Sequence, residues 1–317
     1  MTDSTTGRST PICVIGPGRA GTSVTMRVLN LLGVYIGPEE DLVEPGPGGP
    51  KGFWERRDMM KLDDRLLRLQ GGSWRKPPPL PPGWEAAAEL DPEREQARAL
   101  IERVFARREL WGWKNPRVTL TTAFWLRLVP ELRFVICLRN PIDVADSIAP
   151  PTDRKHEDAF YYSRRGPRPE QTYRLWLTYI ASALANTAGH PRLLVSYDDY
   201  FEARRQTVER LARFVGVAPP QAGSELEHRI EDFVDRGLRH HRTPPAEVLG
   251  DGRLPRDVAS LYMVAELLRA ATEQPGEPGD AELAELEASV DRYARRLLAA
   301  GLDRRKGRAV DSPSLSG

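Results

Sequence analysis

The chain is poor in cysteine and has no long apolar run, and each shortage excludes a class of protein. Two cysteines among 317 residues are too few for a disulfide framework or a four-cysteine zinc site. No apolar stretch approaches the roughly 18 residues of a membrane-spanning helix, so we expect no stable membrane insertion. The polar segment Met1 to Thr10 lacks the apolar core of a signal peptide. We therefore expect a cytoplasmic protein.

An excess of charge of one sign is also missing. The chain has 46 Lys and Arg against 45 Asp and Glu, a net charge of +1, which argues against nucleic acid as a partner but leaves room for a local anion site. Apolar residues make up 40% of the chain, enough for a sizeable core. The sequence predicts a globular protein and carries no signal for an oligomeric state.

Three short apolar runs predict buried strands at 12–15, 133–138 and 193–197. Apolar periodicity and capping residues predict helices over 24–32, 58–69, 91–108, 141–148, 170–188, 203–215, 224–236, 255–271 and 280–300. This alternation indicates an α/β fold: a P-loop-like central parallel sheet covered by helices on both faces, with a helical C-terminal extension. We expect a disordered leader over 1–10, a single domain over 11–302 and a disordered tail over 303–317.

A glycine-rich loop, Gly16-Pro17-Gly18-Arg19-Ala20-Gly21-Thr22-Ser23, joins the first strand to the first helix. Backbone N–H groups of such a loop form an anion site with the helix N-terminus, and glycines let the backbone approach phosphate oxygens. The spacing is close to the P-loop pattern G-x-x-x-x-G-K-[ST], but Thr22 stands where the lysine belongs. The strand ending at Leu138 is followed by Arg139 and not by a magnesium-binding acid. The sequence therefore predicts a phosphate cradle without a metal site.

The second candidate anion motif is Arg139-Asn140-Pro141-Ile142-Asp143-Val144-Ala145-Asp146-Ser147. Arg139 follows a strand at the edge where open α/β sheets bind ligands, and its planar guanidinium suits a phosphate. Asn140 and Pro141 predict the start of a helix that carries Ser147 two turns later. Taken alone, the pattern also fits a salt bridge at a strand end and a surface serine.

Together the two motifs resemble those of sulfotransferases that use 3′-phosphoadenosine 5′-phosphosulfate (PAPS). Gly18 to Ser23 is similar to their 5′-phosphosulfate loop, Pro-Lys/Arg-Ser-Gly-Thr-Thr/Ser, and Arg139 to Ser147 to their 3′-phosphate motif, Arg-(Asn/Asp)-Pro-x-Asp-x-x-x-Ser. Tyr197-Asp198-Asp199 is similar to their Tyr-Glu-Asp element. The resemblance covers about residues 10–216. It implies that PAPS and its product PAP are bound by Gly18, Arg19, Ala20, Gly21, Thr22, Ser23, Arg139, Ser147 and Tyr197.

In-line sulfo transfer needs a base on the acceptor hydroxyl and a cation on the leaving phosphate. Arg19 is placed for the cation, and Lys114 matches a Lys-(Asp/Asn)-Pro-Arg element of long bacterial members. Glu55 is the first candidate for the base, because carbohydrate-type members carry a catalytic Glu in the equivalent stretch. His156, in a loop over 149–169 that could act as a lid, is the second candidate. His240-His241 is expected to be a solvated surface pair, and no spacing of ligand residues predicts a metal.

The resemblance implies transfer of the sulfo group of PAPS, without metal, to a hydroxyl of a small-molecule or glycosylated acceptor. Two alternatives remain: a kinase-like phosphotransferase on a P-loop scaffold, and a non-catalytic nucleotide-binding protein. Loop aromatics either line an acceptor pocket or pack on the core; they are Phe53, Trp54, Trp74, Trp84, Phe160, Tyr161 and Tyr162. Trp113, Trp125, Trp176 and the thiols of Cys13 and Cys137 are expected in the core.

Overall fold

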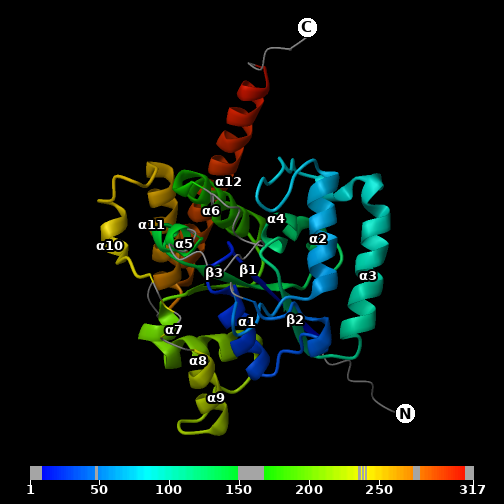
Figure 1. The fold of residues 1–317 in the computed structure, drawn as a ribbon, viewed down its shortest axis with the longest axis vertical. Helices are drawn as coiled ribbons and strands as arrows, with labels where there is room; N and C mark the ends of the chain where they lie inside the picture. Colours follow the sequence, from blue (N-terminus) through cyan, green and yellow to red (C-terminus); the bar gives the residue numbers. More distant parts are fainter. Residues whose placement is uncertain are drawn as a thin grey trace.

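The fold is built on a four-stranded parallel sheet (Figure 1). The computed structural model describes residues 9–46, 49–148, 168–234, 237, 239, 241–273 and 279–310. The strands are β1 (Thr10–Ile15), β2 (Leu110–Lys114), β3 (Arg133–Leu138) and β4 (Arg192–Ser196), in the order β2-β1-β3-β4. The chain leaves β1 toward β2 on one side and returns to β3 on the other. The strand order therefore reverses between β1 and β3, which is where open α/β sheets bind ligands at their carboxyl edge.

Successive residues of each central strand enter two separate cores. Cys13 and Ile15 of β1 pack in one core, whereas Ile12 and Val14 pack in the other. All four side chains are fully buried. Because helices cover both faces of the sheet, the strands are continuous apolar runs rather than alternating ones.

One face of the sheet is covered by α1 (Thr22–Leu31), α8 (Arg204–Val215) and α9 (Glu225–Phe233). The other face is covered by α2 (Arg57–Leu69), α3 (Asp91–Phe105), α4 (Val118–Leu126), α5 (Pro141–Ile148), α6 (Pro169–Asn186), α11 (Arg256–Ala271) and α12 (Asp280–Val310). Short helices are α7 (Asp199–Glu202), α10 (Pro245–Val248) and the 3₁₀ turns Glu39–Asp41, Trp84–Ala86 and Ala88–Leu90. None of the helices within the described ranges is both long and apolar enough to cross a membrane.

The predicted fold class is confirmed, and the sequence patterns locate three of the four strands. They do not predict β2 or α4. Helix α12 runs to Val310, past residue 303 where the sequence predicts a disordered tail, and β1 begins one residue before the predicted domain boundary. Trp113, Trp125 and Trp176 are buried as expected, and burial raises the pKa of both the Cys13 and the Cys137 thiol.

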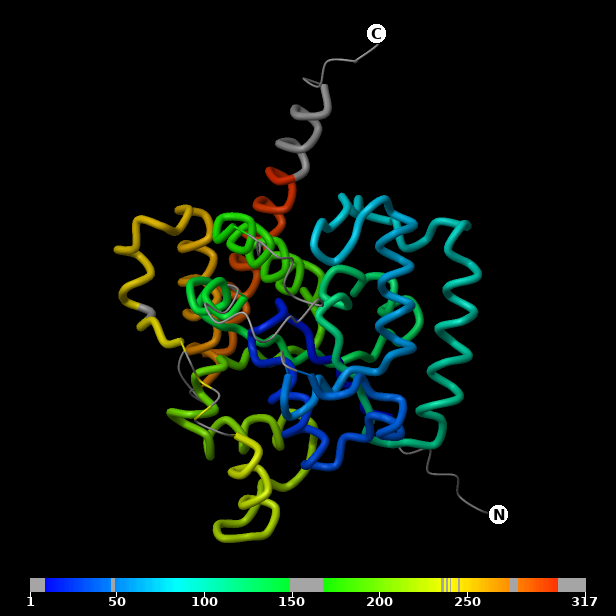
Figure 2. The backbone as a smooth tube through the Cα atoms, in the orientation of Figure 1, coloured from blue at the N-terminus to red at the C-terminus, as the bar shows by residue number. Residues whose placement is uncertain are grey.

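Helices α11 and α12, from the C-terminal part of the chain, lie beside α6, although α6 is far from them in the sequence (Figure 2). Arg192, at the start of β4, donates from Nη1 to Asp291 Oδ1 of α12 at 2.8 Å. This ion pair joins the sheet to the last helix. The C-terminal helices are therefore packed into the same body as the sheet.

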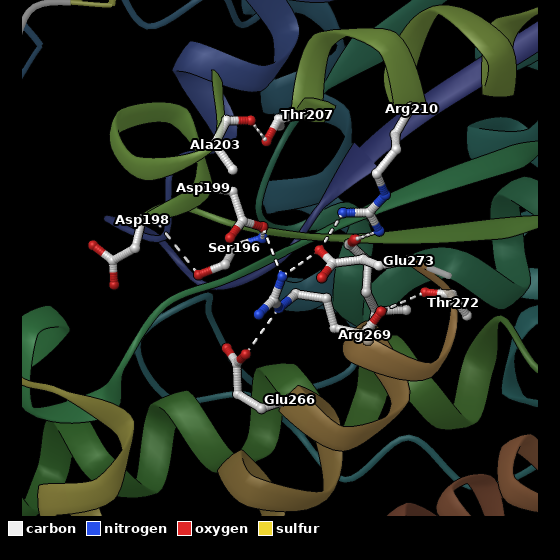
Figure 3. Close-up of polar contacts among 11 residues, drawn as sticks. Ser196, Asp198, Asp199, Ala203, Thr207, Arg210, Glu266, Arg269, Thr272 and Glu273 are labelled. Carbon is white, nitrogen blue, oxygen red and sulfur yellow. Dashed lines mark hydrogen bonds and ion pairs between the residues drawn. The ribbon is translucent and has the colours of Figure 1, made fainter. Parts of the chain in front are cut away.

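A second set of ion pairs joins α11 and α8 at the carboxyl end of β4 (Figure 3). Arg269 Nη1 lies 3.0 Å from Asp199 Oδ2 and also contacts Glu273. Glu273 in turn lies 2.5 Å from Arg210 Nη1. These contacts fix the start of α7, and thereby the turn that carries Tyr197.

Candidate active site

The glycine-rich loop lies between the carboxyl end of β1 and the start of α1. Gly16 N donates to Thr119 Oγ1 of α4 at 2.9 Å, which anchors the start of the loop. Arg19 and Gly21 both have left-handed backbone, with φ of 69° and 90°. A Cβ on Gly21 would lie 2.8 Å from Tyr197 Cδ2. Glycine is therefore required at position 21, both for its backbone and because the tyrosine ring packs against it.

Arg139 joins the loops that follow β1, β3 and β4. Its Nη1 donates to the backbone oxygen of Arg19 at 3.0 Å, and its guanidinium lies 4.4 Å from the centre of the Tyr197 ring. The structure therefore brings together three of the residues that the sequence assigns to one ligand. They meet where the strand order reverses.

The guanidinium of Arg139 fits an anion. The side chain is 5% exposed, and it forms no salt bridge with any described residue. Its Nε is buried without a hydrogen-bond partner. Burial lowers the pKa of Arg139, while Tyr197 and Asp143 oppose this shift. A phosphate at this position would satisfy Nε and replace the lost hydration of the cation.

The helix that follows Arg139 begins as predicted. Asn140 Oδ1 accepts a hydrogen bond from Ile142 N at 2.9 Å, which satisfies one free donor at the start of α5. Ser147 lies two turns later, half-buried, and donates to Val144 O at 2.8 Å. Its role toward a 3′-phosphate stays a prediction.

The segment 241–243 covers this motif, which the sequence does not predict. Arg139 Nη2 donates to His241 O at 3.4 Å, and Asn140 Nδ2 donates to Thr243 O at 2.9 Å. Thr243 N and Oγ1 both donate to Asp143, at 3.2 and 2.7 Å. His241 is half-buried, and His240 lies outside the described residues. The contacts run mainly through backbone atoms, so residue types alone give little sign of them.

Lys114 and Glu55 form a buried ion pair beside the start of α1. Lys114 Nζ lies 2.5 Å from Glu55 Oε1 and 3.3 Å from Ser23 Oγ, while Ser23 Oγ donates to Phe53 O at 3.0 Å. Lys114 is 1% and Glu55 4% exposed. Burial lowers the pKa of Lys114, and the neighbouring Glu55 opposes this shift. Lys114 of β2 thus places an ammonium group beside Ser23, next to Thr22, where the P-loop pattern has a lysine.

Arg117 is a further charged residue of the site, and the sequence analysis gives it no role. Its Nε lies 2.7 Å from Asp64 Oδ1, and its Nη1 lies 3.9 Å from Glu55 Oε2. Its backbone N donates to Asn115 Oδ1 at 3.1 Å. Glu55 is therefore held between two cations, and Arg117 is held by two carboxylates.

Asp63 of α2 holds the side chain of Asn115 in place by a hydrogen bond. It is fully buried, and its carboxylate accepts hydrogen bonds from Thr121 Oγ1 at 2.6 Å, Trp125 Nε1 at 2.9 Å and Asn115 Nδ2 at 2.6 Å. Burial raises the pKa of Asp63 to about 6, although these hydrogen bonds and Arg117 favour the charged form. The signal in the sequence is an acid inside the apolar stripe of a helix, which needs buried partners.

An open pocket adjoins the glycine-rich loop. It is lined by Pro17, Gly18, Trp74, Pro116, Arg117, Val144, Ile148, Thr172, Leu175, Trp176 and Tyr179. Of the described loop aromatics, Trp74 alone lines it; Trp54 packs against Phe233 at 5.9 Å between ring centres, and Trp84 is buried. His156, Phe160, Tyr161 and Tyr162 lie outside the described residues.

A family model described as the sulfotransferase family matches residues 11–221. The chain belongs to the sulfotransferase family. This agrees with the glycine-rich loop after β1 and the arginine at the end of β3. No curated protein matches the chain.

Three solved structures are similar to this chain at low identity. Sulfotransferase STF1 from Mycobacterium tuberculosis H37Rv is 15% identical over 80% of this chain and 76% of that one, with a TM-score of 0.44. The sulfotransferase domain of the Synechococcus PCC 7002 olefin synthase is 15% identical over 91% and 97%, with a TM-score of 0.39. Retinol dehydratase in complex with androsterone and PAP is 15% identical over 72% and 65%, with a TM-score of 0.36.

Proposed function

We propose that this sulfotransferase moves the sulfo group of PAPS to a hydroxyl of a small-molecule acceptor. The observation that carries the proposal is Arg139, a buried cation with an unpartnered Nε that contacts the phosphate loop through Arg19 O. A ligand with phosphates at two positions would use both the loop and this guanidinium. PAPS has this arrangement, and when bound it supplies the activated sulfo group.

Each part of the loop region has a role in this proposal. Backbone N–H groups from Gly18 to Ser23, with the hydroxyl of Thr22, hold the 5′-phosphate. Ser23 contributes its backbone N–H, because its hydroxyl donates to Phe53 O. Arg139, with Ser147 and Tyr197, holds the 3′-phosphate. Arg19 and Lys114 stabilise the charge that develops on the leaving phosphate oxygen.

Glu55 is the proposed general base. The acceptor oxygen bonds to sulfur as the bond between sulfur and the phosphate oxygen breaks, the acceptor proton passes to the carboxylate, and PAP leaves. Lys114 and Arg117 hold Glu55 in place for this step. His156 is the alternative base and lies outside the described residues.

The proposal is tested by mass spectrometry of products formed from purified protein, PAPS and a diverse set of alcohols and phenols. A product heavier by one sulfo group is the expected result, with turnover that persists in excess EDTA. No product with PAPS, together with ATP hydrolysis that requires Mg²⁺, would favour a kinase-like enzyme. Binding of PAP without turnover on any acceptor would favour a nucleotide-binding protein.

Arg139→Ala separates the two phosphate positions. We expect PAP to bind about 2 kcal/mol more weakly, the scale of one lost charge-assisted contact. Adenosine 5′-phosphosulfate, which has no 3′-phosphate, should lose much less affinity. Calorimetric titration of both ligands measures the difference, and equal losses would remove Arg139 from the 3′-phosphate.

A further inference from the structure

Resting on the proposed function, we infer that the acceptor is a neutral, largely apolar alcohol or phenol that carries a ring. It would bind in the pocket beside Pro17 and Gly18. A charged acceptor or a sugar would fit this pocket poorly. Three features of the walls carry the inference: their position, their surface and their charge.

The pocket shares elements with both phosphate motifs. Pro17 and Gly18 belong to the glycine-rich loop, and Val144 and Ile148 belong to α5, the helix that follows Arg139. An acceptor in this pocket would lie against the loop proposed to hold the sulfo donor. The position therefore suits the acceptor rather than a second, remote ligand.

Among the described residues, the walls offer mainly apolar surface, with Thr172 and Tyr179 as the two lining hydroxyls. Trp176 Nε1 donates to Arg139 O at 3.0 Å, and Tyr179 OH donates to Trp74 O at 3.1 Å, so both groups already have partners. Leu175 adds an aliphatic side chain. A sugar would bury several hydroxyls here with few partners, at a cost of roughly 1–3 kcal/mol for each unsatisfied group. A flat ring would instead contact the aromatic walls without this cost.

Arg117 is the one charged residue among the described lining residues, and its charge is already balanced. Asp64 lies 2.7 Å and Glu55 3.9 Å from its guanidinium, and the guanidinium lies 5.5 Å from the centre of the Trp74 ring. An anionic acceptor would compete with these carboxylates instead of meeting an unpaired cation. The wall therefore favours a neutral acceptor.

The test compares four acceptors with PAPS: 2-naphthol, decahydro-2-naphthol, 3-hydroxy-2-naphthoic acid and glucose. We expect kcat/KM for the two neutral ring compounds to exceed that of glucose and of the acid by at least about 100-fold. Calorimetric titration of each acceptor into protein saturated with PAP gives a readout that does not depend on turnover. The same order of affinity is expected there.

Substitutions of pocket residues test whether the preference for neutral ring acceptors arises in this pocket. Trp74→Ala and Leu175→Ser should raise KM for 2-naphthol about 10-fold or more and leave the Kd of PAP unchanged. Leu69→Ala is the control, because Leu69 is an exposed leucine of α2, 51% exposed, outside the pocket.

The outcomes separate the acceptor class from the function. The acceptor class would be overturned if glucose or the acid were sulfated at an equal or higher rate, or if KM were unchanged in both pocket variants. In either case, binding of PAP would leave the proposed function standing. Absence of PAP binding and of transfer to every acceptor would overturn the proposed function itself. Preference for the neutral ring compounds, lost in the pocket variants, supports the inference.

Discussion

The backbone of Gly21 and the ring of Tyr197 make one close contact within the proposed cofactor site. Gly21→Ala would place a Cβ 2.8 Å from Tyr197 Cδ2 at a residue whose φ is 90°. The ring would have to move, which would disturb its contact with Arg139. We expect PAP to bind at least about 10-fold more weakly, as measured by calorimetric titration.

Gly33→Ala is the matched control for this change. Gly33 also has a left-handed backbone, with φ of 102°, but an added Cβ would meet no atom within 4 Å. Both variants should lose about 1–3 kcal/mol of unfolding free energy from backbone strain, and only Gly21→Ala should lose PAP affinity. Equal PAP affinity in the two variants would separate Tyr197 from the ligand.

Glu55 is either the base or the partner that orients Lys114, and one substitution distinguishes the two roles. Glu55→Gln keeps the size and a hydrogen-bond acceptor for Lys114 Nζ but cannot take the proton. We expect kcat to fall about 10²–10⁴-fold, the range for a lost general base, with PAP affinity unchanged. The loss should be greatest on aliphatic alcohols and smallest on acidic phenols, which ionise without help.

Lys114→Met provides the comparison. If Lys114 stabilises the leaving phosphate, its removal should slow acceptors of every acidity by a similar factor. Near-normal turnover of an aliphatic alcohol by Glu55→Gln would rule out Glu55 as the base. His156→Asn would then be the next variant, with the pH–rate profile as its readout.

At the scale of elements, Asp63 joins α2 to α4 and to the turn that follows β2. Its pKa in the folded protein is about 6, against 3.8 for an exposed aspartate. Because the folded state holds the proton more tightly than the unfolded chain, the contribution of Asp63 to the unfolding free energy falls as pH rises from about 4 to about 6. Two pKa units correspond to about 3 kcal/mol.

Urea unfolding of the wild type and of Asp63→Asn, from about pH 4 to about pH 7, measures this contribution. As pH rises over that interval, the wild type should lose roughly 2–3 kcal/mol more unfolding free energy than Asp63→Asn. In Asp63→Asn the new side-chain NH₂ would face the NH₂ group of Asn115, and two donors cannot bond to each other. A rotation of the Asn115 amide would relieve this but would break the hydrogen bond from Arg117 N to Asn115 Oδ1. A pH-independent difference between the two proteins would show that Asp63 does not titrate there.

Strand β2 and helix α4 are not predicted from the sequence, and each has a physical reason. Strand β2 carries Gly112, which weakens a strand pattern; here a Cβ would lie 2.3 Å from Ile12 O, so the close packing of β1 requires glycine. Helix α4 is buried on nearly all sides, so it shows no alternation of apolar and polar faces. The strands β1, β3 and β4 are apolar runs bounded by turns and could be predicted.

Some parts of the candidate site could likewise be predicted from the sequence, and others could not. The loop and Arg139 could be predicted because each lies at the end of a recognisable strand. The contact of Asp63 with Asn115, and that of Thr243 with Asp143, joins residues far apart in sequence. No local pattern encodes such pairs, since they exist only after the helices have packed.

At the scale of the whole molecule, β4 is held at both ends by C-terminal helices. Arg192 and Asp291 pair at its start, and Asp199 and Arg269 pair beyond its end. Helices α11 and α12 also lie beyond residue 221, where the family match ends. Their contacts with β4 and α6 predict that they unfold together with the sheet as one cooperative unit.

Substitution of the Arg192–Asp291 pair tests this cooperativity. The two side chains are 4% and 9% exposed. Arg192→Met leaves the Asp291 carboxylate buried without its partner, at a cost of about 3–5 kcal/mol, whereas Asp291→Leu leaves Arg192 with Glu287 at 3.6 Å and should cost less. Arg192→Met and Asp291→Leu should each lower Tm by roughly 5–15 °C in a chain of this size. The double variant should recover most of this loss, because two apolar side chains replace the pair.

Circular dichroism and tryptophan fluorescence, followed together during urea unfolding, supply the decisive measurement. All seven tryptophans precede α11 and α12 in the chain, and Trp176 contacts α11 through Tyr262, whereas circular dichroism reports all helices. A single shared transition, shifted equally for both probes in each single variant, is expected for one unit. If circular dichroism showed an earlier transition that moved alone in Asp291→Leu, then α11 and α12 would form a separate unit.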